Sequence, residues 1–200
     1  YTITYGNDSE WAWASESGPA SYTIEDSVTL RPPARAGYSF EGWFDSQDDN
    51  NNGTGNEVLS WSAGNKIGNI TLYPKWRAGN STYIVEHYFQ KLNTDGSGST
   101  DYNNETSYTN TGIVGTTGQT TNAASYQQTV AGFEFERVEN VTIAADNSSV
   151  AKIYYKRSTI TYTFEKNSNE TWRDGTASST ITKTGLYGAE FTAPEIEKLG

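Results

Sequence analysis

The feature that most constrains this fold is a pair of alternating aromatic segments that occurs twice. Residues 37–44 (GYSFEGWF) are followed by residues 70–76 (ITLYPKW), and both alternate large apolar with polar side chains. A weaker copy of the pair follows at residues 132–136 (GFEFE) and 151–157 (AKIYYKR). Alternation with a period of two is typical of strands that bury one face. The sequence therefore predicts consecutive β modules, and such arrays favour scaffold or adhesion roles over catalysis.

The chain divides into three predicted modules. The first covers residues 1–77 and the second residues 83–157, and residues 158–200 are the start of a third, truncated module. Each module opens with a similar alternating segment, at residues 1–5, 83–90 and 159–164. A module of about 75 residues can bury only a thin core. We therefore expect a mainly β fold, α+β at most.

The connections between modules are short. Residues 77–82 are predicted to form a polar hinge, and a second hinge is predicted at residues 157–158. Both leave little slack, so adjacent modules should form a semi-rigid, elongated array. Within the second module, the Gly-, Ser- and Asn-rich residues 92–105 predict a long hairpin loop, and residues 123–128 are the best candidate for one short helix.

The composition excludes several kinds of partner. The net charge is -10 with a pI near 4.5, and no run of Lys or Arg interrupts the acidity. Nucleic-acid binding needs clustered basic residues and is not expected. No apolar run is long enough to span a membrane, so membrane insertion is not expected either. The absence of Cys is compatible with an extracellular bacterial protein.

Catalysis is not predicted, because the sequence offers few groups for it. His87 is the only histidine, and neither Cys nor a G-x-S-x-G turn is present. A triad or a histidine zinc site would need those partners. His87 lies in an alternating segment, where Glu86 and Tyr88 should occupy the opposite face. We interpret His87 as a surface or cross-strand residue and the chain as a non-enzyme.

One loop matches half of a calcium-binding pattern. Residues 48–53 (DDNNNG) fit D-x-[DN]-x-[DN]-G, in which Asp48, Asn50 and Asn52 present side-chain oxygens at alternate positions. The twelfth position lacks the usual Glu, and Glu57 lies two places early. The pattern predicts a weak calcium site at most, with no other cofactor. A solvated acidic hairpin loop is the simpler interpretation.

Trp11, Trp13 and Trp61 lie outside the repeated aromatic segments and are candidates for a sugar-binding platform. Aromatic rings stack on sugar faces for the reasons that make them common at interfaces. However, only 34% of the residues are hydrophobic while 14% are aromatic, so the core must be built from few, large side chains. Core or inter-module packing is therefore the competing interpretation, and the one we favour.

The motifs resemble known bacterial repeats. Residues 1–77, with an opening TITY segment, Gly-Tyr-x-Phe-x-Gly-Trp and Leu-Tyr-x-Lys-Trp, resemble the Listeria-Bacteroides repeat, or internalin-type B-repeat. Residues 83–157 resemble mucin-binding-protein-like repeats more loosely, through the opening YIVEHYFQ, a G-x-x-G spacing and GFEF. The resemblance implies tandem ubiquitin-like β-grasp modules in an extracellular protein of the bacterial cell surface.

Three functions are compatible with this resemblance. The first is a non-enzymatic stalk or spacer with a possible adhesive role, in which neighbouring modules of the same chain are the main partners. The second is an adhesin module that binds host glycan or mucin. The third is a self-assembling unit that contributes edge strands to a filament of identical chains.

Overall fold

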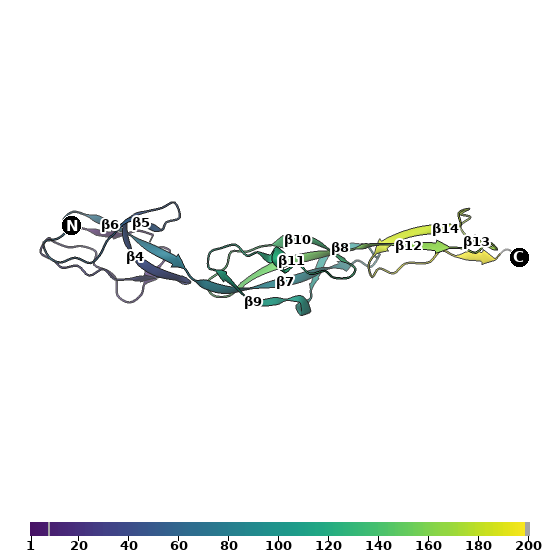
Figure 1. Ribbon diagram of the computed structural model, residues 1–200, viewed down its shortest axis with the longest axis horizontal. Helices are drawn as coiled ribbons and strands as arrows, with labels where there is room; N and C mark the ends of the chain where they lie inside the picture. The colour runs from purple at the N-terminus through teal and green to yellow at the C-terminus, as the bar shows by residue number, and fades with distance from the viewer. Residues whose placement is uncertain (8, 199–200) are drawn as a thin grey trace. The chain divides into compact units, whose positions relative to one another are not determined.

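The computed structural model describes residues 1–7 and 9–198. Strands cover 51% of the chain and helices 4%, which confirms the prediction of a mainly β fold (Figure 1). Contacts divide the chain into two compact units. The first comprises Tyr1–Tyr83, Ile113–Thr120 and Thr142–Ser149, and the second comprises Ile84–Gly112, Thr121–Val141 and Val150–Gly200. The division into three modules stays a prediction.

The first unit contains a four-stranded sheet with the strand order β1-β6-β4-β5. Its strands are β1 (Ile3–Tyr5), β6 (Ile70–Ala78), β4 (Tyr38–Gln47) and β5 (Gly53–Glu57). β4 pairs antiparallel with both of its neighbours, whereas β1 runs parallel to β6. The short strands β2 (Ala12–Trp13) and β3 (Pro33–Ala34) form a separate antiparallel pair. Both alternating segments of the first module are therefore strands, as predicted.

A β-bulge decides which side chains of β4 enter the core. The register with β6 shifts between Phe40 and Gly42, which makes Glu41 an extra residue. Gly42 has φ of 150°, a conformation that side chains disfavour. After the bulge Trp43, rather than Gly42, shares a face with Phe40, and their rings are 5.4 Å apart. Trp43 is consequently buried, with 3% of its surface exposed.

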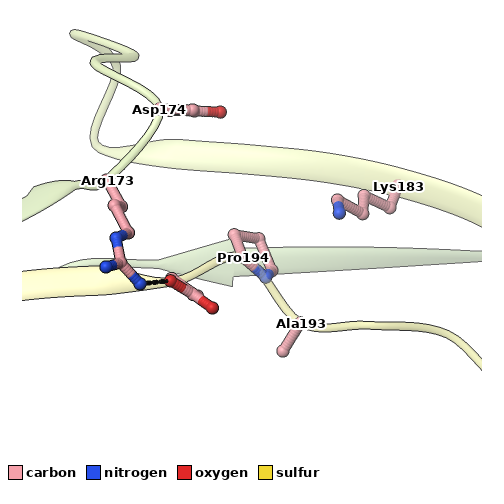
Figure 2. Close-up of a pocket in the computed structure, with 6 residues that line it drawn as sticks. Arg173, Asp174, Lys183, Ala193 and Pro194 are labelled. Atoms are coloured by element: carbon pink, nitrogen blue, oxygen red, sulfur yellow. Dashed lines mark hydrogen bonds and ion pairs between the residues drawn. The ribbon is translucent and has the colours of Figure 1, made fainter.

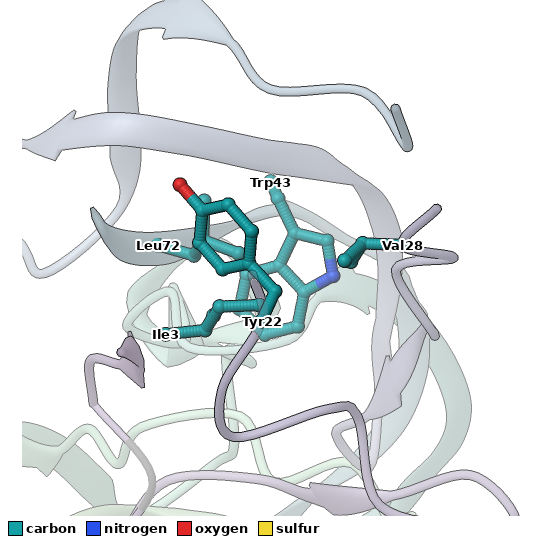
Figure 3. Close-up of a cluster of buried hydrophobic side chains, with 5 residues drawn as sticks. All are labelled: Ile3, Tyr22, Val28, Trp43 and Leu72. Atoms are coloured by element: carbon teal, nitrogen blue, oxygen red, sulfur yellow. The ribbon is translucent and has the colours of Figure 1, made fainter. Parts of the chain in front are cut away.

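The core of the first unit is small and aromatic, as the composition requires. Its fully buried members are Ile3, Tyr22, Val28, Trp43 and Leu72 (Figure 3). The polar atoms of the two aromatic side chains are satisfied: the Tyr22 hydroxyl donates to the carbonyl of Gly68, and the Trp43 Nε1 donates to the carbonyl of Arg31. Few apolar side chains thus form a core without leaving these polar groups unpaired.

The second unit contains most of a five-stranded sheet. Four strands follow the order β10-β11-β7-β8, and β9 also pairs with β7. The strands are β7 (Asn80–Leu92), β8 (Gly98–Asn104), β9 (Asn110–Thr116), β10 (Phe133–Glu139) and β11 (Ser149–Arg157). Single 3-10 turns lie at Thr106–Tyr108 and Ala123–Tyr126. The short helix is thus found where it was predicted. The prediction of a long loop at residues 92–105 is wrong, because half of these residues form β8.

Two further strand pairs complete the second unit. β12 (Thr159–Glu165) pairs antiparallel with β14 (Thr180–Leu186), and β13 (Glu170–Trp172) pairs antiparallel with β15 (Ile196–Lys198). Trp172 is buried, and its Nε1 donates to the carbonyl of Ser178. An isolated two-stranded sheet is marginally stable in water. The β12–β14 pair therefore needs contacts with the rest of its unit.

Candidate functional site at the module junctions

The polar hinge predicted at residues 77–82 is wrong, because almost all of it is strand. β6 ends at Ala78 and β7 begins at Asn80, so Gly79 alone lies between them. Both backbone groups of Gly79 are hydrogen-bonded. Its N–H donates to the carbonyl of Gly37 at 2.8 Å, and its carbonyl accepts from the N–H of Thr117 at 2.9 Å. This connection is therefore fixed on both sides.

The second junction repeats this arrangement. β11 ends at Arg157 and β12 begins at Thr159, so Ser158 alone lies between them. The N–H of Ser158 donates to the carbonyl of Gly132 at 2.9 Å, and its carbonyl accepts from the N–H of Tyr187 at 2.9 Å. We call the linking residue and its two hydrogen bonds the junction clamp.

Equivalent sequence positions supply the partners in both clamps. The acceptor is each time the glycine that opens an aromatic segment, Gly37 in GYSF and Gly132 in GFEF. The donor is each time the residue before the second glycine of a G-x-x-G segment, at residues 115–118 and 185–188. The repeated motifs of the sequence therefore meet at both one-residue connections between strands.

The acceptor glycines lie where a side chain would not fit. Gly37 and Gly132 have φ of 76° and 80°, in the left-handed region that other residues enter only at a cost. A Cβ atom on Gly37 would overlap Ala145 and Thr117, and one on Gly132 would overlap the Tyr187 ring. Close approach of the two backbones thus depends on these glycines.

Side chains reinforce the second clamp. The Arg157 guanidinium donates to the carbonyl of Gln90 at 2.9 Å and to the carbonyl of Tyr187 at 2.6 Å. The ring of Tyr187 packs edge-on against Phe133 at 5.9 Å. These contacts attach the end of β14 to the five-stranded sheet, which supplies the support that a two-stranded sheet lacks alone.

The candidate sugar platform is divided by the fold. Trp11 and Trp13 are half-buried and pack against one another and against Trp43, with ring centroids 5.0 to 6.1 Å apart. Trp61 instead contacts Tyr22 at 5.0 Å. All three border the core shown in Figure 3. Only Trp11 and Trp13 therefore offer neighbouring edges, and sugar binding stays a prediction.

The candidate calcium loop connects β4 to β5 and uses its oxygens internally. The Asp48 carboxylate accepts from the N–H groups of Asn50 and Asn52, each at 2.9 Å. The Asn52 side-chain oxygen accepts from the N–H of Trp76 at 2.7 Å. Glu57 lies at the end of β5, opposite Phe44. Among the described residues no group of three or more acidic, His or Cys side chains could hold a metal, and the calcium site stays a prediction.

His87 is buried rather than at the surface, contrary to one of the two interpretations of its alternating strand. Its Nδ1 lies 3.0 Å from the Tyr155 hydroxyl, and its Nε2 lies 3.2 Å from the Asn110 Oδ1. The Tyr155 hydroxyl also accepts from the N–H of Gln128, so its hydrogen is available to His87 Nδ1. A neutral ring protonated on Nε2 satisfies every partner. Burial lowers the pKa of His87 below its ordinary value.

A surface pocket of about 360 Å³ in the second unit is lined by charged side chains (Figure 2). Arg173 lines it and pairs with the carboxylates of Glu195 and Glu197. Lys183 donates to the carbonyl of Thr192 at 3.2 Å. These cations already have partners within the chain, so the pocket carries no assigned chemistry.

Among the described residues, no helix is long and apolar enough to cross a membrane.

The chain matches no protein-family model, and a search of curated proteins gives no significant match.

Proposed function

We propose that this chain is a non-enzymatic spacer segment of an extracellular bacterial surface protein, built from tandem β-grasp-like modules. The observation that carries the proposal is the junction clamp, which occurs at Gly79 and again at Ser158. A flexible tether would have a polar linker with free backbone groups. A one-residue connection bonded on both sides instead suits a segment that holds what it carries at a set position.

The topology of the first sheet supports the β-grasp part of the proposal. The opening strand β1 and the closing strand β6 are parallel neighbours, and β4 and β5 follow on the other side of β6. A small sheet with its first and last strands adjacent and parallel is the arrangement expected of a β-grasp module. The resemblance of residues 1–77 to bacterial surface repeats agrees with it.

Composition supports the extracellular part of the proposal. The net charge of -10 and the absence of Cys suit a chain that stays soluble without disulfides and is not attracted to an anionic envelope. We therefore expect neighbouring modules of the same chain to be its main contacts.

Insertion at a junction tests the spacer proposal. A short Gly-Ser segment inserted after Gly79 should break the clamp while both flanking strands keep their sequences. NMR relaxation of the backbone amides should show residues 1–77 tumbling together with residues 84–157 in the native chain and separately in the variant. The matched control is the same insertion after Asn50, in the loop between β4 and β5, which should leave the tumbling unchanged.

Independent tumbling in the native chain would contradict the spacer proposal, because the connection would then act as a tether. Small-angle scattering on the same samples gives a second readout. A spacer should have one defined maximum dimension, and the variant with the insertion after Gly79 should show a broader distribution.

Glycan adhesion is the second candidate function, and the observation that favours it is the pairing of half-buried Trp11 with Trp13. The binding site would then consist of these two rings and would not include Trp61. A glycan array tests it on the native chain. Adhesion predicts a saturable signal that is lost in Trp11→Ala and kept in Trp61→Ala, provided that both variants stay folded. A spacer without adhesive function binds none of the glycans.

A further inference from the structure

β12 repeats the sequence of β1 but has fewer neighbours. Residues 2–5 and residues 159–162 share the tetrapeptide TITY. β1 runs parallel to β6, with Ile3 opposite Ile70 and Tyr5 opposite Leu72. β12 pairs with β14 on one side, and no strand of the described residues lies on its other side. The same tetrapeptide thus has a closing strand beside it in one place and an open edge in the other.

Backbone hydrogen bonds show that the occupied edge and the open edge are equivalent. In the first unit Ile70 donates to the carbonyl of Thr2, and Gly6 donates to the carbonyl of Leu72, so every second residue from Thr2 faces β6. The N–H of Ile3 points the other way, to the carbonyl of Ala20.

The same parity holds in β12. Tyr187 donates to the carbonyl of Ser158 and Lys166 donates to the carbonyl of Ser179, so the even-numbered residues face β14. Alternation then directs the backbone groups of Thr159, Thr161 and Thr163 to the open edge. In the alignment of the two TITY segments, Thr159 and Thr161 correspond to Thr2 and Thr4. The backbone groups of Thr2 and Thr4 face β6, so the open edge of β12 is equivalent to the edge of β1 that β6 occupies.

The side chains of β12 are also only partly covered. Ile160, Tyr162 and Phe164 alternate along one face and are half-buried, whereas the equivalent Ile3 is 4% exposed in the core of the first unit. Phe191 stacks on Tyr162 at 4.3 Å, yet 48% of its surface stays exposed. An added strand with apolar residues on this face would bury further apolar area.

We propose that the open edge of β12 binds, in parallel, an extended polypeptide strand with the alternation of β6. The occupant is a separate polypeptide segment with apolar side chains at every second position, as in residues 70–76 (ITLYPKW). Its register follows from β1 and β6: the residue equivalent to Ile70 lies opposite Ile160, and the one equivalent to Leu72 lies opposite Tyr162. Recognition combines backbone hydrogen bonds with burial of alternate side chains.

The test uses the full chain and a synthetic peptide with the sequence of residues 69–78. Because edge amides exchange only from the unbound state, exchange at Thr159, Thr161 and Thr163 should slow about tenfold at peptide concentrations about ten times the dissociation constant. A spin label at the peptide N-terminus should broaden signals near Thr159, and one at the C-terminus should broaden signals near Glu165. The opposite broadening pattern would overturn the parallel register.

Two matched pairs of variants distinguish pairing at the strand edge from nonspecific binding of the peptide. In the peptide, N-methylation of the Leu72 equivalent removes an N–H that faces the edge, whereas N-methylation of the Thr71 equivalent removes one that faces away. In the chain, Thr161→Pro removes an N–H from the open edge of β12. The control is Thr184→Pro in β14, because Thr184 lies opposite Thr161 and its backbone groups face away from β12.

Binding should be lost with the first member of each pair and kept with the second. The methylated peptides are tested against the native chain, so they still distinguish the two outcomes even if Thr161→Pro unfolds β12. Absence of protection at millimolar peptide, equal effects within the peptide pair, or protection of the same three amides by self-association of the chain alone would each overturn the proposal.

Discussion

At the scale of single residues, each clamp depends on one glycine, Gly37 or Gly132. An ordinary turn needs glycine only for its positive φ, whereas these two positions also leave no room for a side chain. Gly132 combines a positive φ with a close approach to the Tyr187 ring, while Gly175 has nearly the same φ, 79°, with nothing within 4 Å of the site of a Cβ atom. Backbone strain is therefore common to both positions, and the overlap is specific to the clamp.

Gly132→Ala should destabilise the β12–β14 pair by at least about 2 kcal/mol, because left-handed strain adds to the overlap with Tyr187. Gly175→Ala should cost only about 1 kcal/mol, from the strain alone. Urea unfolding followed through the NMR signals of β12 measures both. Equal losses would mean that the close approach to Tyr187 contributes nothing.

The protonation of His87 should make stability depend on pH near neutrality. The buried ring has a lowered pKa, so below about pH 6.5 the unfolded chain binds a proton that the folded chain does not. The free energy of unfolding should therefore be highest above pH 6.5 and fall as the pH drops through the folded-state pKa.

Urea unfolding at pH 7 and pH 5.5 measures this effect. Acidic groups such as Asp45 and Asp146 have pKa values below their ordinary values near 4, so they do not titrate in this window. His87→Gln should abolish the difference between the two pH values. A difference that persists in His87→Gln would assign it to another group.

At the scale of strands, the β4 bulge is the feature that the core depends on most. Glu41 itself is dispensable: it forms an ion pair with Arg77 at 3.1 Å on the surface, worth less than about 1 kcal/mol. What matters is the bulge itself, because it accommodates the extra residue and keeps Trp43 on the same face as Phe40.

Gly42→Ala should therefore be more damaging than Glu41→Ala. A side chain at residue 42 is disfavoured at its φ of 150°, so the substitution should destabilise the first unit by about 1 to 3 kcal/mol. Thermal unfolding and the emission maximum of Trp fluorescence report the change. A Gly42→Ala variant as stable as Glu41→Ala would show that the bulge does not depend on this backbone conformation.

Strands were predictable wherever alternation is local, and contacts between distant segments were not. The segments at residues 37–44, 70–76 and 159–164 are strands, as their side chains indicate. β8 escaped prediction because its Gly, Ser and Asn residues look like a loop, and only pairing with β7 makes it a strand. The alternation correctly placed Glu86 and Tyr88 opposite His87, but the partner that buries His87, Tyr155, is 68 residues away.

At the scale of the whole molecule, the two clamps share a design but no residues. The first uses Gly37, Gly79 and Thr117, and the second uses Gly132, Ser158 and Tyr187. The sequence revealed both sets of motifs through their repetition. It did not show that they meet, because hydrogen bonds between segments dozens of residues apart leave no local signal.

Each clamp should accordingly loosen alone. Gly37→Ala should speed amide exchange at Gly79 and Thr117 without affecting Ser158 and Tyr187, and Gly132→Ala should do the reverse. In the double variant the two effects should add, as expected for sites without shared partners. Exchange measured residue by residue tests this, and any effect of one variant at the other junction would reveal coupling between them.

The parallel pairing of β1 with β6 has a consequence for a chain under tension. If the first module is pulled by its N-terminal end and by Gly79, the two neighbouring strands are drawn in opposite directions along their length. Their hydrogen bonds are then loaded together in shear, whereas a hairpin pulled from its open end would unzip one bond at a time. A module of this topology should resist extension well beyond what its thin core suggests, and force spectroscopy on the chain would register that resistance as a high rupture force.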